Sequence, residues 1–329
     1  MNILITGITG FVGSHLADYL LKETDAMIHG LTRWRSPKEN ILHLVDHDRI
    51  VLEHGDLTDF SSLYRIIKNV RPNYIFHLAA QSYVPYSFNV PAATLDSNVV
   101  GTCNLLEVIK LVKIDDGYDP IVHICSSSEV YGQVREEDIP IKEDCPFRPA
   151  SPYAVSKTGE DMLGLQYWVS WNIKTIRTRM FTHTGPRRGD VFVVAAFAKQ
   201  IAKIEEGLQK PIIKVGNLDS VRTFADVRDT VKAYWLLVNK CDPGDVYNIG
   251  GNITMTIRDM LTMLLNKSYK LKDIKIEVDP NLLRPSDVTL QVPCVDKFVN
   301  KTGWKPEIEF DKTLQDTLDF WRECWRRNV

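Results

Sequence analysis

A tyrosine and a lysine four residues apart, Tyr153 and Lys157, are the pair in this chain best suited to proton transfer. They follow Ser151 and Pro152, which favour the start of a helix, so both should share one helical face, about 6 Å apart along the axis. A phenol with a pKa near 10 is a poor base at neutral pH, but a nearby ammonium and an oxidised nicotinamide favour the phenolate. Tyr153 would then accept a proton from a substrate alcohol. The alternative is an ordinary surface Tyr–Lys pair.

A run of hydroxyl residues and one acid precedes that helix, in the stretch ICSSSEVYG at 124–132. Ligands of open parallel sheets bind beyond the carboxyl ends of strands, which is where these hydroxyls are expected. Ser127 would hydrogen-bond the reacting oxygen and complete a Ser/Tyr/Lys set. Glu129 would remove the C5 proton of a 4-keto sugar, which the adjacent ketone acidifies. A helix-capping or solvent-facing acid is the alternative for Glu129.

Glycines at three positions, Gly7, Gly10 and Gly13, follow a short apolar run and open an amphipathic stretch. Glycine there allows a tight turn, close approach to a pyrophosphate and packing of the helix on the strand. The helix N-terminus offers free N–H groups to the phosphates. The pattern predicts a dinucleotide site, against the alternative of an ordinary glycine-rich turn. The same turn adds Thr9, Phe11 and Val12 to the predicted contacts.

The end of the second predicted strand should decide which nicotinamide cofactor binds. An NAD site usually has an acid there, whereas HGLTRWRS (29–36) has none. Arg33, Arg35 and Ser36 suit a 2′-phosphate and predict NADP, with a solvated basic loop as the alternative. Further cofactor contacts are expected after the third and fourth strands, at Asp56, Leu57, Leu78, Ala79 and Ala80.

The elements that must position these residues follow a strand–helix alternation. Strands are predicted at 2–6, 27–31, 50–54, 74–77, 121–125 and 175–179, and helices at 11–22, 61–70, 92–112 and 151–171. This alternation predicts an α/β fold, a Rossmann-type doubly wound parallel sheet with a smaller, mostly C-terminal α/β substrate lobe. Later elements are predicted at 192–206, 226–239, 245–250, 256–265 and 311–326. We expect residues 1–180, joined by 226–255, to form the NADP-binding domain, and 181–225 with 256–329 to form the substrate lobe.

Composition excludes several other classes of protein. The 329 residues include 40 Lys and Arg against 42 Asp and Glu, a net charge of −2 that would not hold nucleic acid or an anionic membrane. The six cysteines are at least 20 residues apart, so no zinc ribbon or dithiol motif is predicted, and no metal site is expected. Without a secretory signal or an apolar run long enough to span a membrane, a cytoplasmic location is expected.

Longer stretches resemble the extended short-chain dehydrogenase/reductase family over essentially the whole chain, and within it the GDP-mannose 4,6-dehydratases. The most specific are PRRG-x-x-FV and GNLD-x-x-R. The matching stretches are ITGITG (5–10), HGLTRWRS (29–36), HGDLTD (54–59), HLAAQSYVPYSF (77–88), SSSEVYG (126–132), GPRRGDVFV (185–193), GNLDSVR (216–222) and RPSDV (284–288).

The resemblance implies a GDP-sugar substrate and a set of residues to bind it. Arg187, Arg188, Arg222 and Arg284 would meet the diphosphate and the guanosine ribose, although we expect one of the four to be an ordinary salt-bridge residue. Lys199 is a further phosphate candidate. The remaining contacts implied are Ser82 for cofactor and substrate, His183 for the cofactor, and Thr182, Val193 and Gly216 for the substrate.

The mechanism that the resemblance implies has three steps. Tyr153, aided by Ser127 and Lys157, oxidises C4 as hydride passes to NADP+. Glu129 then takes the C5 proton, and water leaves C6 with help from Ser128. Hydride finally returns to C6, so the cofactor is regenerated.

Other features keep alternatives open. The stretches 197–205, 212–229 and 245–251 resemble GDP-4-keto-6-deoxymannose reductases, so a reductase or epimerase acting on a GDP-sugar is the nearest alternative. A catalytically silent NADP-binding protein is the non-enzyme alternative. The dehydratases usually have Thr at Ser127 and Asn-His in the segment 181–183. Their loop after Arg35 is longer, so a homodimer through paired helices is expected here, with a tetramer as the alternative.

Overall fold

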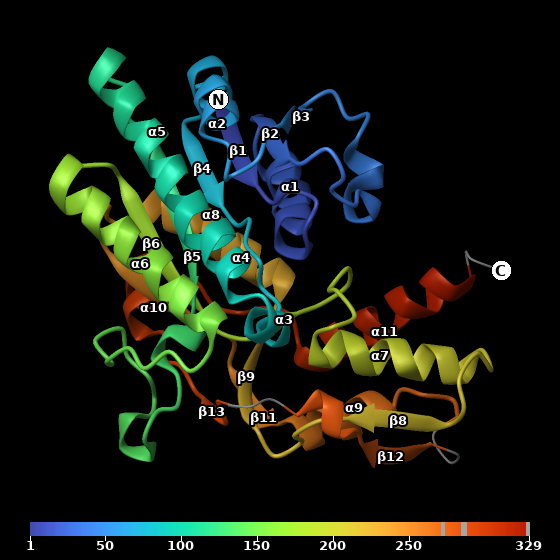
Figure 1. The fold of residues 1–329 in the computed structure, drawn as a ribbon. Coiled ribbons are helices and arrows are strands. Elements are labelled where there is room, and N and C mark those ends of the chain that lie inside the picture. Colours follow the sequence, from blue (N-terminus) through green and yellow to red (C-terminus); the bar gives the residue numbers. More distant parts are fainter. Residues whose placement is uncertain (271–273, 284–287, 327–329) are drawn as a thin grey trace.

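The computed structural model describes residues 1–270, 274–283 and 288–326 (Figure 1). Seven parallel strands form the central sheet, in the order β10-β6-β5-β4-β1-β2-β3. The predicted Rossmann-type fold is confirmed. The strands are β1 (Asn2–Thr6), β2 (Met27–Thr32), β3 (Ile50–His54), β4 (Tyr74–His77), β5 (Ile121–Ser127), β6 (Thr175–Met180) and β10 (Val246–Ile249).

Helices cover both faces of this sheet because its strands are apolar on both sides. Ile3 and Ile5 of β1 belong to one core, together with residues of α1 (Phe11–Glu23) and α8 (Val227–Lys240). Leu4, between them, points to the opposite core. That second core is built by α2 (Phe60–Val70), α5 (Gly101–Asp116) and α6 (Pro152–Trp171). A short helix, α10 (Asp296–Thr302), adds Phe298 to the first core.

The helix predicted over 92–112 is confirmed, because the helical backbone runs without a break from Pro91 to Asp116 and includes one π-helical turn. The structure has α3 (Val84–Asn89), α4 (Pro91–Leu95), a π-helical turn (Asp96–Val100) and then α5. The π-helical turn contains Asn98, whose side chain is fully buried. Its amide accepts from the Gln81 backbone N–H at 2.8 Å and donates to the Gln81 carbonyl at 3.0 Å and to Ser156 Oγ at 2.9 Å. A π-turn lets the side chain reach partners on two other segments.

A smaller layer lies below the C-terminal edge of the sheet (Figure 1). Its core joins α7 (Val193–Glu205), α9 (Ile257–Leu265) and α11 (Phe310–Arg326). The predicted helices in this region agree with the structure to within one residue, but none of the six strands described here was predicted. These strands are β7 (His183–Thr184), β8 (Ile212–Val215), β9 (Val221–Asp226), β11 (Ile253–Thr256), β12 (Lys275–Val278) and β13 (Leu290–Gln291).

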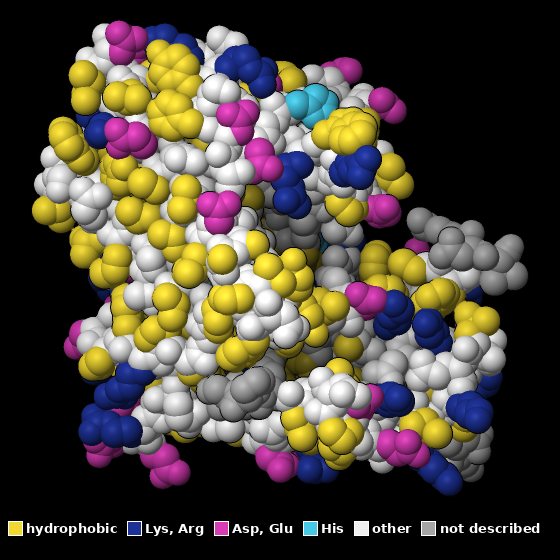
Figure 2. Space-filling view, viewed as in Figure 1, with side chains coloured by type: hydrophobic (Ala, Val, Ile, Leu, Met, Phe, Trp, Pro, Cys, Tyr) yellow, Lys and Arg dark blue, Asp and Glu magenta, His cyan; other side chains and the backbone are white. Residues whose placement is uncertain are grey.

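The surface is hollowed between the part that carries β1–β3 and the part that carries α7 and α11 (Figure 2). Strand β9 leads into this region and pairs with β7, β11 and β13. The division of the chain into lobes at the predicted boundaries stays a prediction. Among the described residues, no helix has the length and apolarity needed to cross a membrane.

Candidate active site

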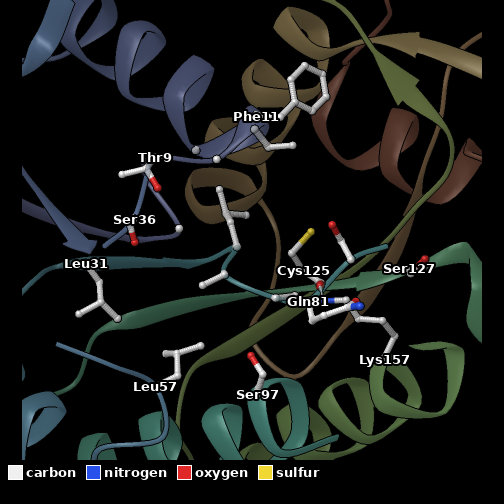
Figure 3. Close-up of a pocket in the computed structure, with 18 of the residues that line it drawn as sticks. Thr9, Phe11, Leu31, Ser36, Leu57, Gln81, Ser97, Cys125, Ser127 and Lys157 are labelled. Carbon is white, nitrogen blue, oxygen red and sulfur yellow. Dashed lines mark hydrogen bonds between the residues drawn. The ribbon is translucent and has the colours of Figure 1, made fainter. Parts of the chain in front are cut away.

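A cavity of ≈ 650 Å³ opens at the carboxyl ends of the central strands. Figure 3 shows Thr9 and Ser36 toward one end of it and Gln81, Cys125 and Lys157 toward the other. The position beyond the strand ends is where ligands of doubly wound sheets bind. The predicted site residues that line it are Gly7, Thr9, Gly10, Phe11, Val12, Gly13, Arg33, Ser36, Asp56, Leu57, Leu78, Ala79, Ala80, Ser82, Ser127, Tyr153, Lys157, His183 and Arg188.

The glycine turn has the close packing that its sequence predicts. Gly7 has a φ of 77°, and a Cβ there would lie 2.9 Å from the Cα of Ala79. A Cβ on Gly13 would lie 2.2 Å from the Gly7 carbonyl oxygen, so only glycine lets α1 approach β1 this closely. Helix α1 starts after Gly10 without a side-chain cap. Its first N–H groups are therefore available to an anionic ligand in the cavity.

Two buried polar atoms in the cavity wall lack hydrogen-bond partners among the described residues, Gln81 Oε1 and His183 Nε2. Burial lowers the pKa of His183 to about 3, so the ring is neutral. Its Nδ1 lies 3.1 Å from the Phe181 carbonyl and must carry the proton, which leaves Nε2 as an acceptor. The ring stacks on Phe11, with centroids 5.8 Å apart. Such unsatisfied atoms suit a ligand that carries amide or hydroxyl groups.

Some residues of the basic loop after β2 line the cavity, and others lie outside it. Arg33 and Ser36 line the cavity, and the Arg33 N–H donates to Ser36 Oγ at 3.1 Å. Arg35, predicted to bind the cofactor, is not among the lining residues. Its guanidinium lies over the ring of Trp34, 4.7 Å from the centroid, and Trp34 is 79% exposed. Arg33 and Ser36 are therefore the better candidates to bind a phosphate at this end.

Tyr153 and Lys157 lie on the buried face of α6, as their spacing predicts. Ser151 Oγ accepts from the Ala154 N–H at 3.0 Å and caps the helix. Tyr153 is 8% exposed and Lys157 is 4% exposed. The Lys157 Nζ donates to the Cys125 carbonyl and to Glu160 Oε2, both at 2.8 Å. This geometry fixes the ammonium beside the end of β5.

The ionisation of Tyr153 reflects opposing effects. Burial raises the pKa of Tyr153, whereas the Lys157 charge and a hydrogen bond with Ser127 lower it. Burial alone would lower the pKa of Lys157, but Glu160 and Tyr153 together hold it above its ordinary value. The lysine therefore remains charged throughout the neutral range. A bound oxidised nicotinamide would add a further positive charge and favour the phenolate.

The turn that carries Ser128 and Glu129 begins where β5 ends. Ser127 Oγ accepts from the Glu129 N–H at 3.2 Å and caps a short 3-10 turn, Ser128–Tyr131. The Tyr131 hydroxyl donates to Asn248 Oδ1 at 2.7 Å and ties the turn to β10. Ser127 lines the cavity, whereas the buried Ser128 and the half-buried Glu129 are not among the residues that line it. The catalytic roles of Ser128 and Glu129 stay predictions.

The two consecutive arginines predicted to bind substrate point to different surroundings. Arg188 lines the cavity, with its guanidinium 3.6 Å from the ring centroid of Phe192, and burial lowers its pKa to about 10. Arg187 instead donates to Asp18 Oδ2 at 2.6 Å and to His15 Nδ1 at 2.7 Å, outside the cavity. The structure thus gives Arg187 the ordinary salt-bridge role that one of the four arginines was expected to have.

The other predicted substrate residues lie outside the lining of the cavity. Lys199 pairs with Asp190, and its Nζ is 5.4 Å from the ring centroid of Trp321. Arg222 donates to the carbonyls of Val221 and Val288. Arg284 falls outside the described residues. Thr182, Val193 and Gly216 are not among the residues that line the cavity.

Several lining residues were not predicted. Gln81 directly follows the predicted cofactor contacts at 78–80, so its position after β4 was a usable signal. Cys125 ends the strand predicted at 121–125 and Ser126 follows it directly, and both belong to β5. Tyr86, Ala93 and Ser97 come from α3, α4 and the π-helical turn, and their residue types carry no signal of a binding site. The full set is Leu31, Gly55, Gln81, Tyr86, Ala93, Ser97, Cys125, Ser126 and Met180.

Comparison with known proteins gives one family model and relatives of two kinds, each matching nearly the whole chain. The family model described as GDP-mannose 4,6 dehydratase matches residues 4–317. The GDP-6-deoxy-D-mannose reductase of Pseudomonas aeruginosa is 35% identical over 320 residues, which is 97% of each chain. The GDP-mannose 4,6-dehydratase of Yersinia enterocolitica is 33% identical over 96% of this chain and 92% of its own. The structure of RMD from Pseudomonas aeruginosa complexed with NADPH superposes with a TM-score of 0.81, at 32% identity, covering 98% of this chain and 99% of that one.

Proposed function

This chain belongs to the GDP-mannose 4,6-dehydratase family, and on that premise we propose that it converts GDP-mannose, or a related GDP-hexose, into the 4-keto-6-deoxy sugar. The observation that carries the proposal is that Tyr153, Lys157 and Ser127 share one cavity with the glycine turn. Glu129, two residues beyond Ser127, supplies the acid–base group that dehydration needs beyond oxidation and reduction.

NADP is the cofactor that fits this cavity. Arg33 and Ser36 would hold the 2′-phosphate, since a guanidinium matches phosphate oxygens and no acid ends β2. The free N–H groups at the start of α1 would hold the pyrophosphate. His183 Nε2 and Gln81 Oε1 would accept hydrogen bonds from the bound group. When bound, NADP would supply the group that accepts hydride from C4 and returns it to C6.

Side chains of this protein would carry out the proton transfers of the reaction. Tyr153, as the phenolate, takes the C4 hydroxyl proton, and Ser127 orients that oxygen through its hydroxyl. Lys157 keeps the phenolate favoured because its ammonium is held in place and charged. Glu129 would take the C5 proton and pass a proton to the C6 hydroxyl, with Ser128 beside it, so that water leaves. C5 would regain a proton from solvent as C6 is reduced, and Tyr153 would release the C4 hydroxyl proton to solvent, which restores its phenolate.

A GDP-4-keto-6-deoxymannose reductase is the second candidate. The relative from Pseudomonas aeruginosa, named as a GDP-6-deoxy-D-mannose reductase, favours it at 35% identity over 97% of the chain. That reaction uses the same Tyr153 and Lys157, but Tyr153 then donates its proton to the C4 oxygen. It also consumes one NADPH for each product, whereas the dehydratase returns its hydride to the sugar.

Product analysis separates the two candidates. Purified protein given GDP-mannose and a trace of NADP+ should form a 4-keto-6-deoxy sugar, with many turnovers for each NADP+. A panel of GDP-, CDP-, UDP- and dTDP-hexoses, followed by NMR, should show the same product only from GDP sugars. Turnover that requires a keto sugar and one NADPH per product would instead establish the reductase.

We propose that two copies of this chain form a homodimer. Apolar side chains gather on the surface over α5 and α6 (Figure 2). This apolar patch includes Leu111, Ile114, Met162, Val169 and Trp171, all exposed, with Val169 at 73%. Contiguous apolar surface of this kind typically marks a subunit interface. Two copies pairing through α5 and α6 would bury it.

A further inference from the structure

Glu160 is a buried carboxylate beside the reacting pair that the proposed reaction does not use. It is 1% exposed, and Oε2 accepts from Lys157 Nζ at 2.8 Å. Its other oxygen, Oε1, has no hydrogen-bond partner among the described residues. A buried, half-satisfied carboxylate costs folding free energy, and an apolar residue of similar size would cost less. Its presence at this point therefore calls for a role in the site.

The geometry links Glu160 to the reacting phenol through the lysine. Tyr153, Lys157 and Glu160 occupy positions i, i+4 and i+7 of α6, which lie on one helical face. The Lys157 ammonium is held between Glu160 on the helix and the Cys125 carbonyl on β5. Without the carboxylate, a long and flexible side chain would be fixed by one carbonyl alone.

We propose that Glu160 is a positioning residue of the Tyr153–Lys157 pair, whose carboxylate anchors the Lys157 ammonium and controls the net charge that Tyr153 experiences. The inference rests on the proposed function only in that Tyr153 is the group that exchanges the substrate proton. Glu160 lies one turn beyond Lys157 and is 1% exposed, so its carboxylate acts through the lysine and not by contact with the substrate.

Glu160 is the main negative charge facing the Lys157 ammonium, because the other ionisable groups near Tyr153 and Lys157 are neutral, already paired or positively charged. Burial lowers the pKa values of His77 and His123 to about 3 each, so both rings are neutral. Asp161 is compensated by Arg177 and Arg179, each 2.9 Å from one of its oxygens. The remaining groups are the neutral Cys125 on β5 and Tyr234 on α8, and Arg188, whose charge acts on Tyr153 from the cavity.

The charge of Glu160 acts on both members of the pair. It helps to keep Lys157 protonated, and it raises the pKa of Tyr153 because it offsets the ammonium. Burial raises the pKa of Glu160 itself to about 7, against the opposing charge of Lys157. Protonation of Glu160 near neutral pH would thus leave the ammonium uncompensated and favour the phenolate of Tyr153.

The decisive variant is Glu160→Gln, which keeps the shape and removes the charge. In the NADP+ complex, the ionisation of Tyr153, followed by phenolate absorbance against a Tyr153→Phe blank, should move to lower pH by about one unit. The midpoint of the acidic limb of kcat should move in the same direction. Glu307→Gln, which removes an exposed carboxylate paired with Lys232, is the matched control and should move neither midpoint.

Glu160→Asp separates charge from position. It keeps the carboxylate, so the Tyr153 midpoint should stay near that of the wild type, while kcat falls about tenfold because the shorter side chain holds Nζ poorly. An unchanged midpoint in Glu160→Gln, with only a lower melting temperature, would overturn the proposal, as would an equal shift in Glu160→Asp. The absorbance measurement needs no turnover. A protein inactive on every GDP-sugar would refute the proposed function and leave this test intact.

Discussion

Substitution of Arg187 tests how residues outside the cavity support the site, because its guanidinium hydrogen-bonds to three residues that do not line the cavity. It bonds Asp18 Oδ2 at 2.6 Å, His15 Nδ1 at 2.7 Å and the Asn40 carbonyl at 3.2 Å. Breaking a buried pair costs about 3–5 kcal/mol, but the Asp18 side chain is 34% exposed, so we expect about 2 kcal/mol for Arg187→Ala. With an unfolding entropy of about 2.1 cal/mol/K per residue, the melting temperature should fall by about 3 °C.

The assay is a double-mutant cycle of Arg187→Ala and Asp18→Asn, measured by reversible unfolding. We expect a coupling of about 1 kcal/mol or more, since each variant removes the same contact. NADPH should also bind severalfold more weakly in Arg187→Ala, because Asn40 donates to the Thr9 carbonyl in the glycine turn at 3.2 Å. Additive stabilities, with a loss confined to the KM of the GDP-sugar, would refute this reasoning and restore Arg187 as a substrate ligand.

Four other outcomes are expected. Glu129→Gln should bind NADP+ normally but lose dehydration, seen as absent deuterium incorporation at C5; wild-type turnover would contradict its role. Arg33→Glu should weaken NADP+ at least tenfold while sparing NAD+ in fluorescence titrations, and equal losses would argue against a 2′-phosphate contact. Val169→Asp should convert a dimeric wild type into a monomer in sedimentation experiments, and a monomeric wild type would contradict the proposed interface. The folded-state pKa values of His77 and His123 lie near 3, below about 6.5 when unfolded, so stability should be complete above pH 6.5. It should fall by about 1.4 kcal/mol per pH unit for each ring as the pH drops toward 3, and a constant denaturant midpoint between pH 7 and 4.5 would contradict this.

The nucleotide-binding half of the fold could be predicted closely because its signals are local. Short apolar runs, the glycine turn and the Ser151 cap each depend on neighbouring residues, and the six predicted strands agree with the structure to within two residues. The short strands of the substrate lobe could not be found in this way. β13 has two residues and exists because it pairs with β9, nearly 70 positions away in the chain.

The candidate site likewise has residues that local sequence patterns predict and residues whose surroundings depend on distant contacts. Spacing alone placed Tyr153 and Lys157 on one face, and strand order placed Ser127 near them. Sequence could not distinguish Arg187 from Arg188, because their different surroundings depend on a left-handed backbone at Arg187, with a φ of 67°, and on Asp18 of a distant helix. Glu160 was equally hidden, since a glutamate three residues after a lysine usually forms an exposed helical pair.

Asn98 joins parts of the molecule that have separate tasks. One amide group connects the Gln81 backbone in the cavity wall to Ser156, the residue before Lys157 on α6. Helix α6 also carries Val169 and Trp171 on its outer surface. Covering that surface with a second copy would restrain α6, and through Asn98 the same restraint would reach the nucleotide pocket. Affinity for the dinucleotide would then rise with protein concentration, so that dilution of the dimer to monomers would weaken dinucleotide binding.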